Sequence, residues 1–442
     1  MQREQWGSRF GFIMAAAGSA IGLGNIWKFP YLAGTEGGGA FLVLYIVIMA
    51  TFGVALMMTE LAIGRASKLN PVGAFRKMGG KKWMPVGILG VITALMILSF
   101  YSVVGGWTIA YILKSIMGST SSLSGPLLEE QFNNLVGSPI EPLLYHGIFM
   151  VLTVGIVLAG VTQGIEKSVK ILMPLLFVIL ILLVFRSITL PGAREGITFF
   201  LMPKWEQINQ GMVIAAFGQA FFSLSLGMGA MITYGSYLDN KTDIRSAAYW
   251  VVFLDCVVAF LAGLLVLPAV FAFGFNPGAG PGLIFITLPA VFSNMWGGYI
   301  FQIIFFAMLL IAALTSSISI LSIPVAYFSE TFGVTRKWSA TIIGLLIFLV
   351  GCVCSLSLGI WGNVALFDKS FFDLMVYAVD TYMLPIGGIF TALFAGWVAY
   401  NTMAKQLTND GENPYKFLEA WKWMIRIISP LAILWVLYKS LV

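Results

Sequence analysis

The sequence predicts an all-α polytopic membrane protein, and three observations carry this prediction. Of the 442 residues, 59% are hydrophobic and only 10% are charged, whereas a typical soluble domain is about 25% charged. Apolar stretches long enough to cross a bilayer, which takes about 20 residues, recur along the whole chain. Two of these stretches are interrupted near their middles by glycines and small polar residues.

We predict eleven membrane-spanning segments with short loops between them, and therefore one integral membrane domain over residues 1–442. The mean hydropathy of +0.93 agrees with so high a share of spanning sequence. The expected spans are 10–34, 40–63, 86–116, 144–162, 168–188, 211–237, 247–273, 297–328, 339–359, 374–400 and 417–439.

The distribution of charge predicts the orientation of the chain in the membrane. The loop after the second span holds six basic residues and no acid, and the loop 118–143 holds three acids and no base. By the positive-inside rule the N-terminus is cytoplasmic, and an odd number of spans leaves the C-terminus outside. We expect a multi-pass protein of the plasma membrane. The basic loop is explained by topology, so a nucleic-acid partner is not expected.

The first span is too long for a cleavable signal peptide and carries Lys28 and Pro30 near its end, so we expect it to be retained. The three cysteines lie inside apolar spans without disulfide or metal-binding spacing. They are expected to be small buried hydrophobes. His146 is the only histidine, so a zinc-type site is not expected.

The interruptions at Gly18–Asn25 and Ser223–Gly229 each lie near the middle of a span. Unwound backbone is tolerated in a bilayer only where protein or a polar cavity satisfies its N–H and C=O groups. Gly18 and Gly22 also form a small-x-x-x-small pattern, which is typical of close helix packing. Taken singly, the first run fits either interpretation. The matching run in the sixth span favours unwinding and a polar site at the membrane midplane.

The two breaks also indicate a hidden duplication. Spans one to five and six to ten each begin with a broken helix, and because five is odd the second set runs in the opposite direction. This predicts inverted repeats over about residues 8–190 and 210–401, with an additional helix at 417–440. The prediction rests on the placement of the breaks, because similarity between the two halves is not visible in the sequence.

Six motifs follow one another along the chain, at Arg3–Trp6, Gly18–Pro30, Gly37–Phe41, Glu60–Arg65, Gln219–Gly229 and Leu314–Ile318. In this order they resemble the neurotransmitter:sodium symporters, in particular their bacterial amino-acid-transporting members. The resemblance covers the first ten spans and implies a LeuT-like 5+5 inverted-repeat fold with broken helices 1 and 6 and eleven transmembrane helices. It implies a sodium-coupled symporter of amino acids working by alternating access, not an enzyme, with no organic cofactor.

The resemblance implies a substrate site around the two breaks. The N–H groups of Leu23 and Gly24 and the Tyr101 hydroxyl would hold a carboxylate, and carbonyls at Ala20, Phe222 and Ser223 would hold an ammonium group. Monoamine-transporting relatives have aspartate at the position of Gly22, so glycine implies a substrate with its own carboxylate. An apolar pocket with a flexible Met228 favours a neutral hydrophobic or aromatic L-amino acid. The implied substrate-binding residues are Ser19, Ala20, Leu23, Gly24, Ile97, Tyr101, Phe222, Ser223, Ser225, Met228, Ser316, Ser319 and Ile320.

Two sodium sites are implied in the same way, since sodium is a hard cation that prefers oxygen ligands. The first would use Ala20, Asn25, Ser223, Asp255 and the substrate carboxylate, which would couple ion to solute. A Thr-Ser-Ser run within a helix is otherwise typical of hydroxyls bonded to their own helix. The second site would use Gly18, Ile21, Ala312, Thr315 and Ser316.

Asp255 lies about a third of the way into the seventh span, where a charged group is costly and usually functional. Many relatives have asparagine here, and chloride-dependent members bind chloride in the adjoining pocket, whose equivalents are Tyr45, Gln219, Ser223 and Ala259. We expect the Asp255 carboxylate to supply that negative charge, so that transport is chloride-independent. Its protonation on the return step would add proton counter-transport. When the seventh span is aligned with the family at Gly263, the asparagine position falls on Asp255, whereas alignment at Pro268 places it on Leu254.

The resemblance also implies two gates. Lys28 would pair with Asp373 above Phe222 and Tyr101 on the outside, as a weaker latch than the usual arginine. On the inside, the implied gate consists of Arg3 and Glu330, with Trp6 and Tyr237 nearby.

In the fifth span Gly164 and Pro174 would let the helix unwind toward the second sodium site, although they also fit a static kink.

Three other classes of function are alternatives: an amino-acid receptor, an intramembrane hydrolase and an ion channel. A hydrolase needs a base beside its nucleophile, but the only histidine lies far in sequence from Ser223 and Thr315. An ion channel normally has a carbonyl-lined filter that repeats around a pore, and the sequence shows no such repeat. The expected partners are the substrate and the bilayer, and the expected assembly is a monomer or weak homodimer.

Overall fold

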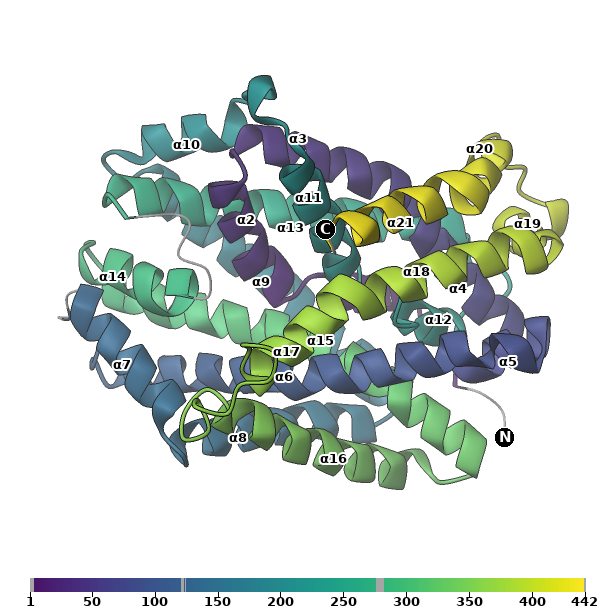
Figure 1. Ribbon diagram of the computed structural model, residues 1–442, viewed down its shortest axis with the longest axis horizontal. Coiled ribbons are helices and arrows are strands. Elements are labelled where there is room, and N and C mark those ends of the chain that lie inside the picture. Colours follow the sequence, from purple (N-terminus) through teal and green to yellow (C-terminus); the bar gives the residue numbers. More distant parts are fainter. Residues whose placement is uncertain (1–3, 121–122, 124, 276–281, 441–442) are drawn as a thin grey trace.

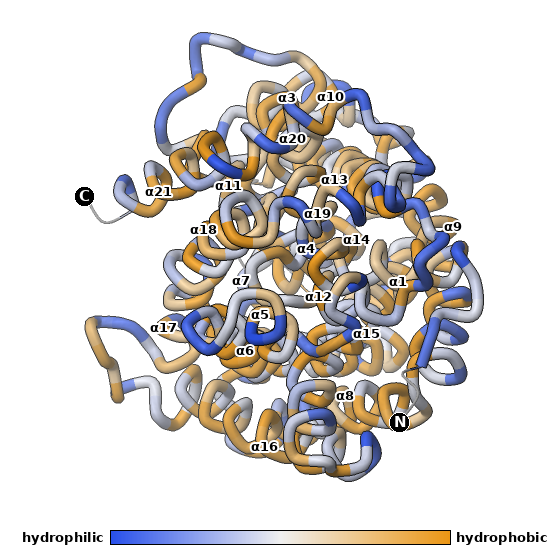
Figure 2. The backbone as a smooth tube through the Cα atoms, turned by 90° about the vertical axis from the view of Figure 1, so that its right-hand side faces the viewer, coloured by the Kyte–Doolittle hydropathy of each residue, from blue (hydrophilic) through white to orange (hydrophobic). Residues whose placement is uncertain are grey.

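The computed structural model describes residues 4–120, 123, 125–275 and 282–440, and every regular element within them is a helix. Figure 1 shows most of the long helices running roughly along the longest axis of the molecule. In Figure 2 the outer helices such as α16 (Arg336–Leu356) are mainly hydrophobic, and hydrophilic stretches gather in the loops. This is the arrangement expected of a bundle surrounded by lipid.

Within the described residues, nine helical segments are long and apolar enough to cross a membrane. The bent pair Arg9–Ala20 and Gly24–Thr35 makes a tenth span, and we assign α11 and α12, on either side of the second break, as the predicted eleventh. In chain order the spans are α1, η1 and α2 (Arg9–Ala20, Gly24–Lys28, Phe29–Thr35); α3, η2 and α4 (Gly39–Ile48, Met49–Gly53, Val54–Ser67); α6 (Met84–Ile116); α8 (Glu141–Leu158); η4 and α9 (Val161–Glu166, Lys167–Ile188); α11 and α12 (Gln210–Ser223, Ala230–Gly235); α13 (Ile244–Ala272); α15 (Gly298–Phe332); α16; α17, η7, α18, η8 and α19 (Phe371–Ala378, Val379–Met383, Leu384–Leu393, Phe394–Val398, Tyr400–Thr408); and α20, η10 and α21 (Leu418–Trp423, Met424–Ile428, Ser429–Lys439).

Short helices occupy the connections between spans. They are α5 (Pro71–Gly79), η3 (Lys81–Trp83), α7 (Gly125–Gly137), α10 (Ala193–Leu201), η5 (Trp205–Gln207), η6 (Leu283–Thr287), α14 (Leu288–Ser293) and η9 (Asn409–Gly411).

The first span is broken where the glycine run predicts. Helix α1 ends at Ala20 because Ile21 adopts an extended conformation, and the chain resumes as a helix at Gly24 after a bend of 51°. The freed N–H of Gly22 donates to Asn25 Oδ1 at 3.2 Å, and that of Leu23 donates to a tyrosine hydroxyl of α6 at 3.1 Å. Protein groups therefore satisfy the unwound backbone, as a site inside a bilayer requires.

The sixth span is broken over residues 224–229, between α11 and α12. Ser225, Gly227 and Gly229 have φ angles of 54°, 84° and 79°, a left-handed conformation that glycine adopts readily. A side chain at Gly227 would also collide with the Leu384 carbonyl of the tenth span. The Gly227 N–H donates to Glu60 Oε1 of α4 at 2.7 Å, so a buried carboxylate caps this break.

The predicted boundary between the fourth and fifth spans was wrong. Residues 144–162 were expected in one span, but α8 ends at Leu158 and the next span begins at Val161. Gly160 has a φ of 88° and makes the turn between them. Gly164, which was expected in the fifth span, lies in the first turn of that span, and this turn is a π-helix rather than an α-helix.

Helices α6 and α15 are the most deeply buried spans and pack along each other through the centre of the bundle. Helix α1 packs on α15, and the broken sixth span reaches the same region through α12. Both breaks therefore lie where the protein, and not lipid, surrounds them.

The cap on the second break generates a prediction about stability. Replacing Glu60 with alanine removes the acceptor of the Gly227 N–H and leaves it unpaired in the interior, which costs about 1–3 kcal/mol. We expect Glu60→Ala to lower the melting temperature of the purified protein in detergent clearly, and Glu60→Gln, which keeps an oxygen at the same reach, to lower it much less. Equal melting of both variants and the wild type would contradict the proposed cap.

Candidate functional site

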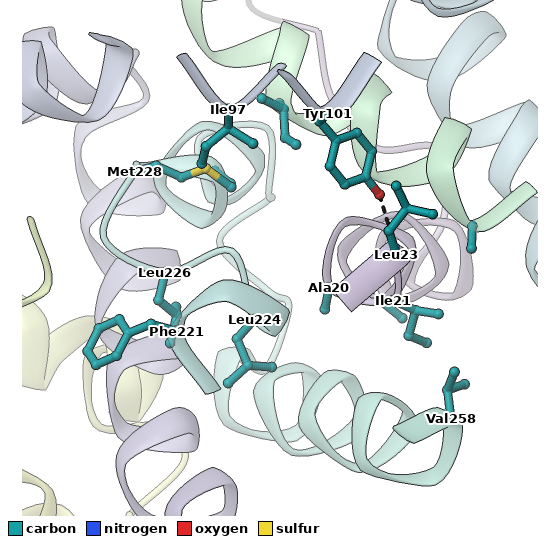
Figure 3. Packing of buried hydrophobic residues seen from close by; sticks show 14 of the residues in the cluster. Ala20, Ile21, Leu23, Ile97, Tyr101, Phe221, Leu224, Leu226, Met228 and Val258 are labelled. Carbon is teal, nitrogen blue, oxygen red and sulfur yellow. Dashed lines mark hydrogen bonds between the residues drawn. The ribbon is translucent and has the colours of Figure 1, made fainter. Parts of the chain in front are cut away.

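A small cavity of about 20 Å³ lies between the two breaks and the central helices α6 and α15. Figure 3 shows Ile97 and Met228 side by side at this place, with the Tyr101 side chain directed at the backbone of Leu23. Of the thirteen expected substrate residues, all but Leu23 and Ser319 line this cavity. The lining residues are Ser19, Ala20, Gly22, Gly24, Ile97, Tyr101, Phe222, Ser223, Ser225, Met228, Ser316, Ile320 and Leu384.

The two expected residues outside the lining still contact it. Leu23 lines a second cavity on the outer side and donates its N–H to the Tyr101 hydroxyl. Ser319 accepts a hydrogen bond from Ser19 at 2.7 Å, joining α15 to the end of α1. The cavity has room for about one water molecule, so a bulky substrate side chain needs Met228 and its neighbours to move.

Any side chain larger than that of glycine at position 22 would require neighbouring side chains to move. A Cβ atom built on Gly22 would lie 2.8 Å from the Tyr101 hydroxyl and would collide with Ser316 Oγ. An aspartate, which monoamine-transporting relatives carry here, would need the surrounding side chains to withdraw.

Asp255 is fully buried and lies at the centre of a polar cluster. Its Oδ1 accepts hydrogen bonds from Asn25 Nδ2 at 2.9 Å and from Ser223 Oγ at 2.8 Å, and its Oδ2 accepts one from Tyr45 at 2.9 Å. The two alignments of the seventh span are thereby distinguished, because Asp255, and not Leu254, faces the break. Three of the four residues expected at the first sodium site meet here, and Ala20 lines the adjoining cavity.

The other equivalents of a chloride pocket lie in the same neighbourhood. Gln219 donates from Nε2 to the Gly24 carbonyl at 2.8 Å. Its Oε1 is buried and has no hydrogen-bond partner within the described residues. Ala259 is buried one turn after Asp255, on the same side of α13. Tyr45 and Ser223 belong to the same pocket, and both donate hydrogen bonds to the Asp255 carboxylate.

The residues expected at the second sodium site also come together. Ser316 Oγ lies 3.2 Å from the Gly18 carbonyl oxygen and 3.3 Å from that of Ile21, so α15 meets the end of α1 through a hydroxyl. Thr315 packs on Gly18, with 3.2 Å between its Cβ and a Cβ placed on the glycine. Its hydroxyl donates to the Ala312 carbonyl at 3.1 Å, the within-helix bond that such a sequence allows.

The expected partner of Lys28 in the outer gate was wrong. Lys28 Nζ lies 2.6 Å from Asp380 Oδ2, and 4.6 Å from the centre of the Phe222 ring. Asp373 lies two helical turns earlier and accepts a hydrogen bond from Ser370. Both aspartates line an outer cavity of about 250 Å³.

Tyr101 and Phe222 line both the outer and the inner cavity and so lie between them. The Lys28–Asp380 ion pair lines the larger of these two cavities.

On the opposite side the chain is closed by its N-terminal segment. Trp6 packs edge-on against Tyr237 at 6.2 Å, and its indole donates to the Tyr234 carbonyl at 3.0 Å. Glu330 accepts hydrogen bonds from the backbone and the side chain of Asn70 at 2.8 Å. The expected pairing of Glu330 with Arg3 lies outside the described residues.

The same segment is tied to the fifth span, which the sequence analysis did not predict. Glu4 accepts a hydrogen bond from the Val161 N–H, and Glu166 accepts from the Gly7 N–H and the Ser8 hydroxyl, all at 2.6–2.9 Å. These contacts join the N-terminus to η4, the π-helical turn that contains Gly164. Pro174 lies inside α9 beyond it.

Two further residues of the site were missed. Asp380 and Leu384 both belong to the tenth span, of which the family resemblance implied only Asp373. Leu384 lies in a Leu-Pro-x-Gly-Gly run whose Gly387 packs on the Gly227 carbonyl of the second break. Small residues that let two backbones approach closely were the available signal.

Comparison with known proteins agrees with this geometry. The model of the sodium:neurotransmitter symporter family matches residues 3–124 and 136–442. An uncharacterized sodium-dependent transporter of Bacillus subtilis, YhdH, is 42% identical over 97% of this chain and 96% of its own length. An uncharacterized sodium-dependent transporter of Haemophilus influenzae is 38% identical over 100% of this chain and 98% of its own length.

The crystal structure of MhsT in complex with L-phenylalanine superimposes with a TM-score of 0.92, at 42% identity, over 99% of this chain and 100% of that one. The predicted LeuT-like fold is thus confirmed. The matched family consists of transporters and not of enzymes. Because the family model covers nearly the whole chain, this protein belongs to the sodium:neurotransmitter symporter family.

Proposed function

We propose that the protein is a sodium-coupled symporter of neutral hydrophobic or aromatic L-amino acids that works by alternating access. The carrying observation is that two broken helices meet around a cavity lined by apolar side chains and by serine and tyrosine hydroxyls, next to the buried carboxylate of Asp255. Such a site can hold a zwitterion by backbone N–H and C=O groups and a cation by oxygen atoms.

The preference for an apolar amino acid has two supports. The cavity is lined in part by the apolar side chains of Ile97, Met228, Ile320 and Leu384. The similar transporter MhsT was solved in complex with L-phenylalanine. The glycine at position 22 leaves room for the carboxylate of the substrate, which argues against a monoamine.

The proposed coupling runs through two sodium ions. One ion would lie among Asn25, Ser223 and Asp255 and touch the substrate carboxylate, and the other between the end of α1 and the Thr315–Ser316 pair. Both sets of residues offer oxygen ligands, which a hard cation prefers. A carboxylate shared between ion and solute makes the binding of each depend on the other.

Transport is proposed to be independent of chloride. Two cations and a zwitterion add positive charge to the interior, and a buried charge has to be compensated. Asp255 supplies one fixed negative charge at the place where relatives bind chloride. Its protonation during the return step would carry a proton outward.

The protein would act in the plasma membrane, with its N-terminus in the cytoplasm, as a monomer or weak homodimer. The orientation is supported by the basic residues of the loop after α4, four of which, Arg76, Lys77, Lys81 and Lys82, are exposed.

The function is tested by uptake into proteoliposomes. With an inward sodium gradient, we expect labelled L-phenylalanine and L-leucine to accumulate inside, and a matched potassium gradient to give no accumulation. Replacing chloride with gluconate should leave the rate unchanged. Binding of the amino acid without any accumulation would select a receptor in place of a transporter, and uptake that ignores sodium would contradict symport.

The role of Asp255 generates a separate prediction. Asp255→Asn keeps the shape of the side chain but removes the charge beside the first sodium site, so uptake in chloride-free medium should fall by roughly tenfold or more. Added chloride should restore a large part of the rate in this variant only. Asp368→Asn, in an exposed loop, is the matched control and should transport like the wild type in both media. An Asp255→Asn variant that is as active as the wild type without chloride would contradict the inference.

A further inference from the structure

Arg426 is a charged residue inside the last span. It lies in η10, eight residues after the first residue of α20, which is about 12 Å along a helix. Figure 1 shows α20 and α21 lying beside α18 and α19 at the edge of the molecule. A cation at such depth is costly unless it is paired or reaches the membrane interface.

Aromatic rings and one carbonyl fix the guanidinium of Arg426. Its Nε donates to the Gly396 carbonyl at 2.6 Å. Its central carbon lies 4.6 Å from the ring centre of Tyr400 and 5.2 Å from that of Trp397, within the range of cation–π attraction. A side chain at Gly396 would meet the Arg426 stem, so the close approach is built into the seam between η8 and η10.

Among the residues that the structure describes, no anion pairs with the Arg426 guanidinium. Within the described residues no carboxylate lies within 4.0 Å of Arg426, and its two terminal nitrogens donate to no protein acceptor. Arg245, in the first turn of the seventh span, is different, because Asp243 binds its guanidinium through two contacts of 3.1 Å. Arg426 thus keeps a fork of N–H donors for a group from outside the chain.

The neighbouring side chains identify where that group comes from. Trp397 and Trp423 are 62% and 51% exposed, which is typical of the aromatic belts at a membrane interface. Beyond Arg426, exposed apolar residues follow at helical spacing toward the middle of the span, at Ile427, Leu431 and Leu434. A ligand with a polar head at Arg426 and an apolar tail along this track fits the surface.

Charge decides the kind of head group. Lys422 lies one turn before Arg426, 5.7 Å from the same Tyr400 ring, and pairs with the exposed Glu419 at 2.9 Å. Lys422 and Arg426 together with the one nearby acid, Glu419, therefore leave a net charge of +1. A guanidinium fork matches phosphate oxygens bidentately, and a basic pocket at the cytoplasmic ends of spans favours an anionic head group.

We propose that Arg426 binds the phosphate of an anionic phospholipid of the cytoplasmic leaflet, in the seam between the tenth and eleventh spans. Trp397 and Tyr400 hold the guanidinium in place, Lys422 adds charge at the edge of the head group, and the acyl chains lie along the apolar track of α21. The site is separate from the cavity between the broken helices and does not depend on which solute is transported.

Native mass spectrometry of the full-length protein in detergent tests the proposal, with phosphatidylglycerol, phosphatidylcholine and inorganic phosphate as probes. We expect the wild type to retain one phosphatidylglycerol in preference to phosphatidylcholine. Arg426→Gln should weaken that retention by about fivefold or more. Lys405→Gln, which removes an exposed charge from the neighbouring α19, is the matched control and should retain the lipid like the wild type.

Three results would overturn the proposal: equal retention of the two lipids by the wild type, phosphatidylglycerol retained by Arg426→Gln as by the wild type, or displacement of the lipid by millimolar inorganic phosphate. The wild-type comparison stands even where Arg426→Gln does not fold. Arg426→Lys keeps the charge and loses the fork, so its retention should fall between those of the wild type and Arg426→Gln, and retention equal to the wild type would contradict bidentate binding.

Discussion

The structure depends on one constraint, which is that a backbone group freed inside a bilayer has to find a partner in the protein. At each break, the freed backbone groups form hydrogen bonds with residues of spans that are distant in the sequence. Tyr101 accepts from the first break, Glu60 accepts from the second, and Ser225 of the second donates to the Ser19 carbonyl of the first at 3.0 Å. The partners that satisfy the unwound backbone are therefore the same contacts that hold α4, α6 and the two broken spans around one cavity.

A second consequence concerns charge. The interior of the bundle holds Asp255 with three hydrogen-bond donors, and no cationic side chain of the described part of the chain forms an ion pair with it. Carboxylates buried in a protein are normally paired or bound to a metal ion. A sodium ion that arrives with the solute is a natural partner, which links the electrostatics of this cluster to the proposed coupling. The same reasoning, with the sign reversed, applies to Arg426 at the lipid-facing edge.

Much of this could be predicted from the sequence because backbone breaks leave a local signal. Runs of glycine in two apolar spans predicted both breaks, and the family resemblance placed Asp255 beside Asn25. Contacts between spans leave no such signal. Asp373 and Asp380 are two turns apart on one span, and Lys28 pairs with Asp380, which lies in the π-helical turn Val379–Met383. The Gly160 turn and the carboxylates that tie down the N-terminus likewise depend on packing that a single sequence does not display.

The central claim is that the cation and the carboxylate of the solute share one place between the broken helices. Equilibrium binding of L-phenylalanine to the purified protein, measured with and without sodium, tests it most directly when L-phenylalaninamide is measured beside it. The account predicts that sodium tightens the binding of the amino acid by about tenfold or more, and that of the amide, which lacks the carboxylate, far less. Affinities for L-phenylalanine that are equal in sodium and in potassium, or an equal gain for both ligands, would contradict it.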